Sequence, residues 1–179
     1  MNRIRESVLG GGPQCGIIAG RRELIERIRK HPLFRALRLD KLAIAALAAT
    51  LRDYLRGNFE AIPALRMIRS SESEIASRAA TLLSSLQPLL ASDSSECRLI
   101  EGESVIGGGS TPEQQLPTRL IELSSSRWTA SELESRLRTP ETGTAVLARI
   151  LHDRVVVDLR TVFPEQEQAL VSAIAVALS

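Results

Sequence analysis

The sequence predicts an α/β protein in which helices cover one face of a small, mostly antiparallel sheet. From about residue 71 the spacing of apolar residues switches between helical and strand periods, in the order helix, strand, strand, helix, strand, strand, helix. A long helix over residues 40–56, apolar on almost every face, precedes this pattern. These observations divide the chain into residues 1–70 and residues 71–179.

The first regular elements follow a glycine-rich turn at residues 10–13. The apolar run Gly16–Ala19 predicts a short buried strand, and Arg21–Lys30 predicts an amphipathic helix. Pro32 ends this helix, because the residue before a proline is pushed out of helical geometry. The inward face of the helix would carry three apolar residues, Leu24, Ile25 and Ile28.

The long helix has clear start and stop signals. Asp40 is a good N-cap, because its carboxylate accepts free amide hydrogens of the first turn, and Gly57 supplies a left-handed stop. Its larger apolar residues fall on one stripe, which consists of Ile44, Leu47, Leu51 and Leu55. A helix apolar on all faces predicts an internal strut inside a larger body than these residues could build alone. Residues 57–70, which include Pro63, predict an irregular connection.

Two capping boxes mark helix starts in the second part. Ser71 and Glu74 precede a helix that ends near Pro88, and Thr129 and Glu132 precede a short helix. Helical spacing predicts the inward residues, which are Ile75, Ala79, Leu82, Leu83 and Leu86 in the first helix and Leu133 and Leu137 in the second.

Four runs predict strands: one from about Glu96, then Leu116–Leu123, Ala145–Leu151 and Val155–Val162. The first two flank a glycine-rich loop at residues 107–115, and the last two should pair as a hairpin. Gln166–Leu178 predicts a closing helix. Its buried face would carry Leu170, Ile174 and Leu178.

The composition is that of a globular protein, with 44% hydrophobic and 25% charged residues. Aromatic residues make up only 3%, which disfavours recognition of nucleic acid by base stacking. Cys15 and Cys97 form no disulfide framework, which is typical of a reducing cytoplasm. No signal peptide or apolar run of about 18 residues predicts export or a membrane span. We therefore expect a cytoplasmic protein.

Positive charge is concentrated in the first part. Residues 1–70 hold 14 lysines and arginines against 6 acidic residues, whereas residues 71–179 hold 9 against 15. The first part could therefore face an anionic partner. The alternative is that the basic residues of 21–30 form the solvated face of a helix.

Several common sites lack their motifs. No lysine follows the glycines of residues 10–16 as in a phosphate-binding loop, and Cys15 stands where the dinucleotide fingerprint needs its last glycine. An anion-binding turn and a plain tight turn both remain open. His31 and His152 have no partners at metal-site spacing, so no metal site is predicted. Ser110 is not in a nucleophile elbow, which disfavours serine hydrolysis.

Arg35 and Arg38 form the most suggestive pair of side chains. They lie in a turn between Pro32 and Asp40, and their spacing places both guanidinium groups on one side. Two such groups suit a phosphate, a carboxylate or another oxyanion. The alternative is that they pair with Asp40 or Glu26, and spacing does not decide between the two.

Four motifs carry a family resemblance: GGPQCGIIAG, then HPLFRALRLDKLAIAALAATLRDYL, then IGGGSTPEQQLP, then ARI followed by VVVDLRTVFPEQE. In order and spacing they resemble bacterial selenocysteine synthase, also called L-seryl-tRNA(Sec) selenium transferase, over nearly all of residues 9–179. The resemblance implies the C-terminal part of a type I pyridoxal-phosphate-dependent, aminotransferase-like fold. Residues 1–70 would be the end of the large pyridoxal-phosphate domain with the interdomain helix, and residues 71–179 the small α/β domain.

The resemblance also implies a chemistry. Enzymes of that family use pyridoxal 5'-phosphate and selenophosphate to convert seryl-tRNA(Sec) to selenocysteinyl-tRNA(Sec), and they form homo-oligomers. Their tRNA-binding N-terminal domain has no counterpart here. By resemblance, Arg35 and Arg38 would bind the anionic selenium donor or the leaving group, and Gly11 and Gly12 would lie in the cofactor-binding loop. Val8 stands in the register of the Schiff-base lysine.

The chain has only two lysines, Lys30 and Lys41, and neither has the glycine-rich setting of that lysine. We therefore expect a truncated or fragment form of the family enzyme that is inactive alone and does not bind the cofactor alone. Two alternatives stay open. One is a non-catalytic interaction domain that pairs with a full-length partner through the exposed side of the central helix. The other is a paralogous pyridoxal-phosphate-dependent lyase.

Overall fold

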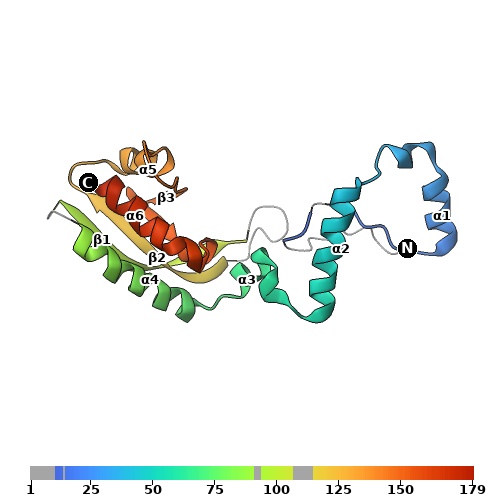
Figure 1. Cartoon of the computed structure of the whole chain (residues 1–179), viewed down its shortest axis with the longest axis horizontal. Helices are drawn as coiled ribbons and strands as arrows, with labels where there is room; N and C mark the ends of the chain where they lie inside the picture. Colours follow the sequence, from blue (N-terminus) through green and yellow to red (C-terminus); the bar gives the residue numbers. More distant parts are fainter. Residues whose placement is uncertain (1–10, 14, 91–93, 107–114) are drawn as a thin grey trace. The chain divides into compact units, whose positions relative to one another are not determined.

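The computed structural model describes residues 11–13, 15–90, 94–106 and 115–179. These residues belong to two compact units, Met1–Met67 and Ile68–Ser179. The first unit contains α1 (Arg22–Lys30), η1 (Pro32–Arg35), α2 (Lys41–Arg56) and η2 (Phe59–Ala61), and α3 (Pro63–Arg69) runs from the first unit into the second (Figure 1).

Both ends of α2 are where the sequence predicts them. The Asp40 carboxylate accepts the amide hydrogen of Ala43 at 2.8 Å, which stabilises the first turn. Gly57 has a φ of 68°, the left-handed conformation that glycine adopts without steric cost. The predicted cap and stop are therefore confirmed.

The chain taken by itself does not bury the helices of the first unit, and the larger body that the sequence predicts around α2 lies beyond the described residues. None of the residues of α2 is buried within the described part of the chain, and Leu42 and Leu55 are 83% and 88% exposed. The predicted inward residues of α1 are also accessible, since Leu24 and Ile28 are both 39% exposed. The described residues of this unit do not supply an apolar surface large enough to cover both helices.

Two predicted elements of the first unit also differ. Gly16–Ala19 is exposed and forms no strand, because a strand needs a pairing neighbour and none of the described residues provides one here. Residues 57–70 are not irregular, since they hold η2 and α3. Pro63 starts α3, because proline fits the first helical position, where its missing amide hydrogen is not needed.

The second unit contains a four-stranded antiparallel sheet with strand order β1-β2-β4-β3. Its elements are α4 (Glu72–Leu86), η3 (Gln87–Leu89), β1 (Ser95–Val105), β2 (Gln115–Ser125), α5 (Ala130–Arg138), β3 (Arg149–Leu151), β4 (Arg154–Asp158), η4 (Leu159–Thr161), η5 (Pro164–Gln166) and α6 (Glu167–Leu178). The helix α4 contacts β1 and β2, α5 contacts β2, β3 and β4, and α6 packs on both helices (Figure 1). The predicted α/β class with an antiparallel sheet is confirmed. The predicted loop at residues 107–115 lies, except for Gln115, outside the described residues.

Strand register builds the core. Leu123 of β2 lies opposite Cys97 of β1 and Val155 of β4, and Ile121 occupies the equivalent central place in the next row, between Leu99 and Val157. Because alternate residues of a strand point to the same face, these residues face the helices together. The buried helical residues that meet them are Ile75, Ala79, Leu82, Leu86, Leu133, Leu137, Leu170, Val171, Ile174, Ala177 and Leu178.

Both predicted capping boxes are present. The Ser71 hydroxyl accepts the amide hydrogen of Glu74 at 3.2 Å, and the Glu74 carboxylate accepts the amide hydrogen of Ser71 at 2.8 Å. Thr129 and Glu132 make the same exchange at the start of α5. Hydrogen bonds from Ser71 hold the pKa of Glu74 below its usual range. This contribution to stability is present above the ordinary glutamate pKa and is lost as the pH falls through the lowered value.

The β3–β4 hairpin is confirmed, although its strands are shorter than predicted. His152 and Asp153 form the turn with φ values of 48° and 58°, which matches the twist of a two-residue hairpin. Asp158 ends β4, because its carboxylate accepts the amide hydrogen of Arg160 at 3.0 Å and starts the 3-10 turn η4. Residues 159–161, predicted as strand, are therefore helical.

Candidate functional site

Arg35 and Arg38 lie on the connection between α1 and α2. His31 starts this connection, since its Nδ1 accepts the amide hydrogen of Leu33 at 3.3 Å. Arg35 is the last residue of η1, Arg38 lies in the segment without regular structure before α2, and both side chains are exposed. The local geometry thus presents two guanidinium groups to solvent within four residues of each other.

The alternative pairing of these arginines is not observed. The Asp40 carboxylate is used as the cap of α2, and Glu26 accepts a hydrogen bond from Arg22 at 3.0 Å. Neither Arg35 nor Arg38 forms an ion pair with any other residue that the structure describes. Their donors therefore remain available within the described chain, as binding of an oxyanion requires.

Gly11 and Gly12 pack against the first unit's own helices. Gly11 has a φ of 87°, and a Cβ added there would lie 2.6 Å from Cγ2 of Ile62. A Cβ on Gly12 would lie 3.2 Å from Cγ2 of Thr50 in α2. Close packing and left-handed geometry thus already require glycine at Gly11. No hydrogen bond or ion pair between described residues joins this turn to the arginine pair. Val8 lies outside the described residues.

The lysines of this chain do not fit the capture of pyridoxal phosphate. Lys30 is the last residue of α1 and Lys41 the first residue of α2, and both are exposed. A Schiff-base lysine is normally activated by desolvation in a pocket or by a neighbouring cation inside one. Neither residue has such surroundings.

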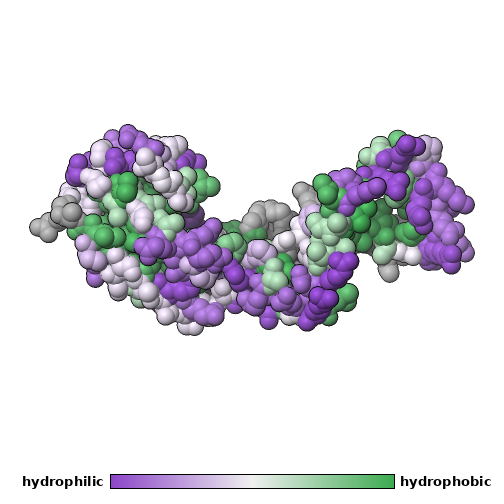
Figure 2. Space-filling view, viewed as in Figure 1, coloured by the Kyte–Doolittle hydropathy of each residue, from purple (hydrophilic) through white to green (hydrophobic). Residues whose placement is uncertain are grey.

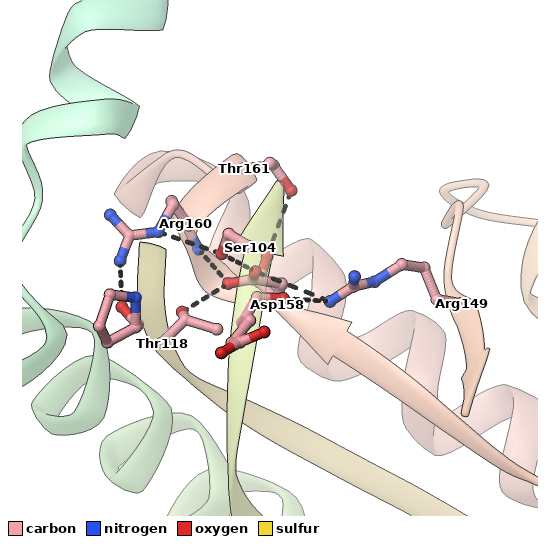
Figure 3. Close-up of polar contacts among 8 residues, drawn as sticks. Ser104, Thr118, Arg149, Asp158, Arg160 and Thr161 are labelled. Carbon is pink, nitrogen blue, oxygen red and sulfur yellow. Dashed lines mark hydrogen bonds and ion pairs between the residues drawn. The ribbon is translucent and has the colours of Figure 1, made fainter. Parts of the chain in front are cut away.

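A cluster of polar side chains in the second unit was not predicted from the sequence (Figure 3). Arg160 follows β4 directly, is only 6% exposed, and donates from Nε to the Ser104 hydroxyl at 3.1 Å. Its Nη1 donates to the carbonyl of Ser70 and its Nη2 to the carbonyl of Pro117, both at 2.6 Å. One arginine therefore joins β1, the start of β2 and the segment before α4.

Asp158 is the acceptor at the centre of this cluster. Its carboxylate accepts hydrogen bonds from the hydroxyls of Ser104 and Thr118, the latter at 3.0 Å, and Arg149 lies 4.0 Å away (Figure 3). Burial lowers the pKa of Arg160 from its ordinary value, and the negative charge of Asp158 opposes this effect. An arginine so perturbed stays charged at neutral pH.

This cluster stabilises the fold and has few donors left for a ligand. The hydrogen bonds named above occupy all three nitrogens of the Arg160 guanidinium and both carboxylate oxygens of Asp158. The only sequence signal for this cluster is the DLR motif that follows a run of valines. The partners of Arg160 lie 43 to 90 residues away, so no local pattern connects them to it. The cluster therefore holds strand ends together, and the exposed arginine pair stays the candidate binding site.

Comparison with known proteins shows the family. The family model described as SelA, L-seryl-tRNA selenium transferase, matches residues 6–163. The chain belongs to this family. The resemblance expected from the four sequence motifs is thus confirmed, and it covers both the arginine pair and the Asp158 cluster.

Relatives in the selenium transferase family share about two fifths of the aligned residues. The L-seryl-tRNA(Sec) selenium transferase of Nitratidesulfovibrio vulgaris is 44% identical over 154 residues, which are 84% of this chain and 32% of the relative. That of Geotalea daltonii is 42% identical over 166 residues, 92% of this chain and 35% of the relative. The protein of the same name from Aquifex aeolicus is 39% identical over 155 residues, which are 87% of this chain and 33% of the relative. The chain thus spans about a third of the length of these relatives.

No helix in the described part of the chain combines the length and the apolar character that crossing a membrane requires.

Proposed function

We propose that this chain supplies the C-terminal part of a selenium transferase that converts seryl-tRNA(Sec) to selenocysteinyl-tRNA(Sec), with selenophosphate as the selenium donor. The match of residues 6–163 to the family is the observation that carries this proposal. In it, residues 1–70 are the end of the cofactor domain with the interdomain helix, and residues 71–179 are the small domain. The enzyme acts in the cytoplasm as a homo-oligomer.

Arg35 and Arg38 have the role of binding the anionic selenium donor. A guanidinium presents paired N–H donors to phosphate oxygens, and both side chains are exposed and have no ion-pair partner among the described residues. Two cations aimed at one anion bind it and also fix its orientation relative to the acceptor. Gly11 and Gly12 keep the adjoining cofactor loop close to α2.

Pyridoxal phosphate is the cofactor of the proposed reaction, and catalysis requires a Schiff-base lysine that these residues do not provide. Purified chain mixed with one equivalent of the cofactor is expected to show no visible band of lysine-linked cofactor. Borohydride followed by peptide mass spectrometry should find no more adduct on Lys30 or Lys41 than on free N-acetyl-lysine, because both amines are exposed. Stoichiometric adduct on either lysine would contradict the proposal.

The role of the arginines is tested in a fusion that supplies the rest of the enzyme. The preceding part of the Geotalea daltonii relative is joined to residues 9–179 of this chain, and conversion of seryl-tRNA(Sec) with selenophosphate is measured. Changing Arg35 and Arg38 together to alanine should lower kcat/KM for selenophosphate about 100-fold or more, since a hydrogen bond to a charged group contributes about 1.5–3 kcal/mol.

The matched control removes two other exposed cations of the same unit, through Arg52→Gln and Arg56→Gln on α2. This double variant should keep the kcat/KM of the unchanged fusion. Equal losses in the two double variants, or full turnover without Arg35 and Arg38, would refute the assigned role.

A second candidate function is supported by the exposed apolar residues of α2. Leu42 and Leu55, at the two ends of α2, are 83% and 88% exposed, and Ile44 and Leu51 between them are 50% and 37% exposed. Exposed apolar surface of this extent is typical of an interaction site. In this alternative the chain is a non-catalytic domain that binds a full-length family member through α2. Co-purification with the intact enzyme, lost on Leu42→Ser and Leu55→Ser together, would favour it over a catalytic role.

A further inference from the structure

The helix α1 divides into an apolar side and a basic side. At 100° per residue, Leu24, Ile25 and Ile28 occupy one arc of the helix. The rest of the circumference carries four cations, Arg22, Arg27, Arg29 and Lys30, and two anions, Glu23 and Glu26, all of them exposed, so this face has a net positive charge. Hydrophilic residues accordingly dominate the surface of α1 in Figure 2.

The charge of this face is poorly neutralised by its neighbours. Arg22 pairs with Glu26, in an exposed contact with side chains 91% and 49% accessible. Arg27, Arg29 and Lys30 form no ion pair or hydrogen bond through their side chains with the part of the chain that the structure describes. Residues 21–38 together hold 7 cations against 2 anions.

The helix α5 shows what an ordinary solvated helix of this protein looks like. Its Glu132 carboxylate closes the capping box, and Glu134 forms an ion pair with Arg138. Arg136 donates to the carbonyl of Ala177 at 2.8 Å. In α5 each of these charges has a partner inside the unit, whereas three of the four cations of α1 have none among the described residues.

We infer that the basic face of α1, defined by Arg22, Arg27, Arg29 and Lys30, binds the phosphate backbone of RNA. The inference rests on the proposed function, in which the substrate is an aminoacylated tRNA. Unpaired lysines and arginines suit phosphates, which supply most sequence-independent affinity for nucleic acids. No aromatic residue lies on α1, so the contacts are to phosphates and not to stacked bases. A lipid surface is less suited, since only three apolar residues back this short helix.

The test is binding of a fluorescein-labelled RNA hairpin, of acceptor-arm length, to the full chain by fluorescence anisotropy at several salt concentrations. The double variant Arg27→Gln and Lys30→Gln should bind about tenfold more weakly at 0.1 M salt, and its log–log salt dependence should be shallower by about 2, because each phosphate contact contributes about one to that slope. Glutamine keeps a similar helix propensity, and far-UV circular dichroism checks that the helix remains.

The controls are a second double variant, a conservative variant and lipid vesicles as an alternative ligand. Arg52→Gln with Arg56→Gln on α2 removes the same charge and should change the affinity less than twofold, while Arg27→Lys should retain binding. Equal weakening by both double variants, absence of RNA binding by the unchanged chain, or tight binding only to vesicles of equal parts phosphatidylglycerol and phosphatidylcholine would each overturn the inference. RNA binding that depends on α1 in a chain whose fusion is inactive would support this inference while refuting the proposed function.

Discussion

Arg160→Ala is expected to lower the free energy of unfolding of the second unit by about 3–5 kcal/mol, the cost of removing one member of a buried charged network. The variant leaves the carbonyls of Ser70 and Pro117 without their donor. It also removes the buried positive charge that interacts electrostatically with the Asp158 carboxylate, whose side chain is only 10% exposed. A buried group that loses its partner costs more than the hydrogen bond itself contributed.

Urea titration followed by tryptophan fluorescence measures this loss. Trp128 is the only tryptophan, and it lies in the second unit with the guanidinium of Arg136 4.3 Å from its ring centroid. Arg149→Ala is the matched control, since it removes another arginine near the same carboxylate, 4.0 Å away and 50% exposed. It should cost no more than about 1 kcal/mol. Equal costs for the two variants would show that burial of Arg160 is not what matters.

Leu123→Ala is expected to cost about 2–5 kcal/mol, because the substitution leaves a cavity in a packed core. Leu123 is fully buried at the centre of its strand row, between Cys97 and Val155. The same titration should move its midpoint to lower urea with an unchanged slope. The shift should be far larger than for an exposed leucine of the same unit.

Leu147→Ala provides that comparison. Leu147 is 78% exposed, so its replacement should alter the free energy of unfolding by no more than about 0.5 kcal/mol. A negligible loss from Leu123→Ala would mean that the register of β2 described here is wrong, whereas a large loss from Leu147→Ala would mean that the Leu147 side chain is packed and not exposed.

Sequence reasoning succeeded where the decisive interactions are local. The capping boxes at Ser71 and Thr129 and the cap at Asp40 each depend on residues three positions apart, so the sequence alone predicts which residues form them. The core of the second unit was predictable for a related reason. Its apolar residues recur at helical or strand spacing, and each face packs within the same unit.

Sequence reasoning failed where the burial or the role of a residue depends on partners far away in the sequence. The apolar residues of α2 predicted burial inside a larger body, but periodicity does not identify the residues that would cover them. The role of Arg160 depends on carbonyls at Ser70 and Pro117, which no spacing rule connects to it. For the candidate site, the sequence singled out Arg35 and Arg38, and the structure adds that no other described residue pairs with them.

The outermost strand of the sheet has a consequence for self-association. Among the described residues β1 pairs with β2 alone, so one side of an eleven-residue strand is open to another chain. That strand carries four charged residues, Glu96, Arg98, Glu101 and Glu103. An apolar strand that paired with its open side would have to lie beside these charges. Charges placed along an edge in this way keep sheets of neighbouring molecules from joining into aggregates, so this eleven-residue strand can stay open on one side without recruiting a further strand.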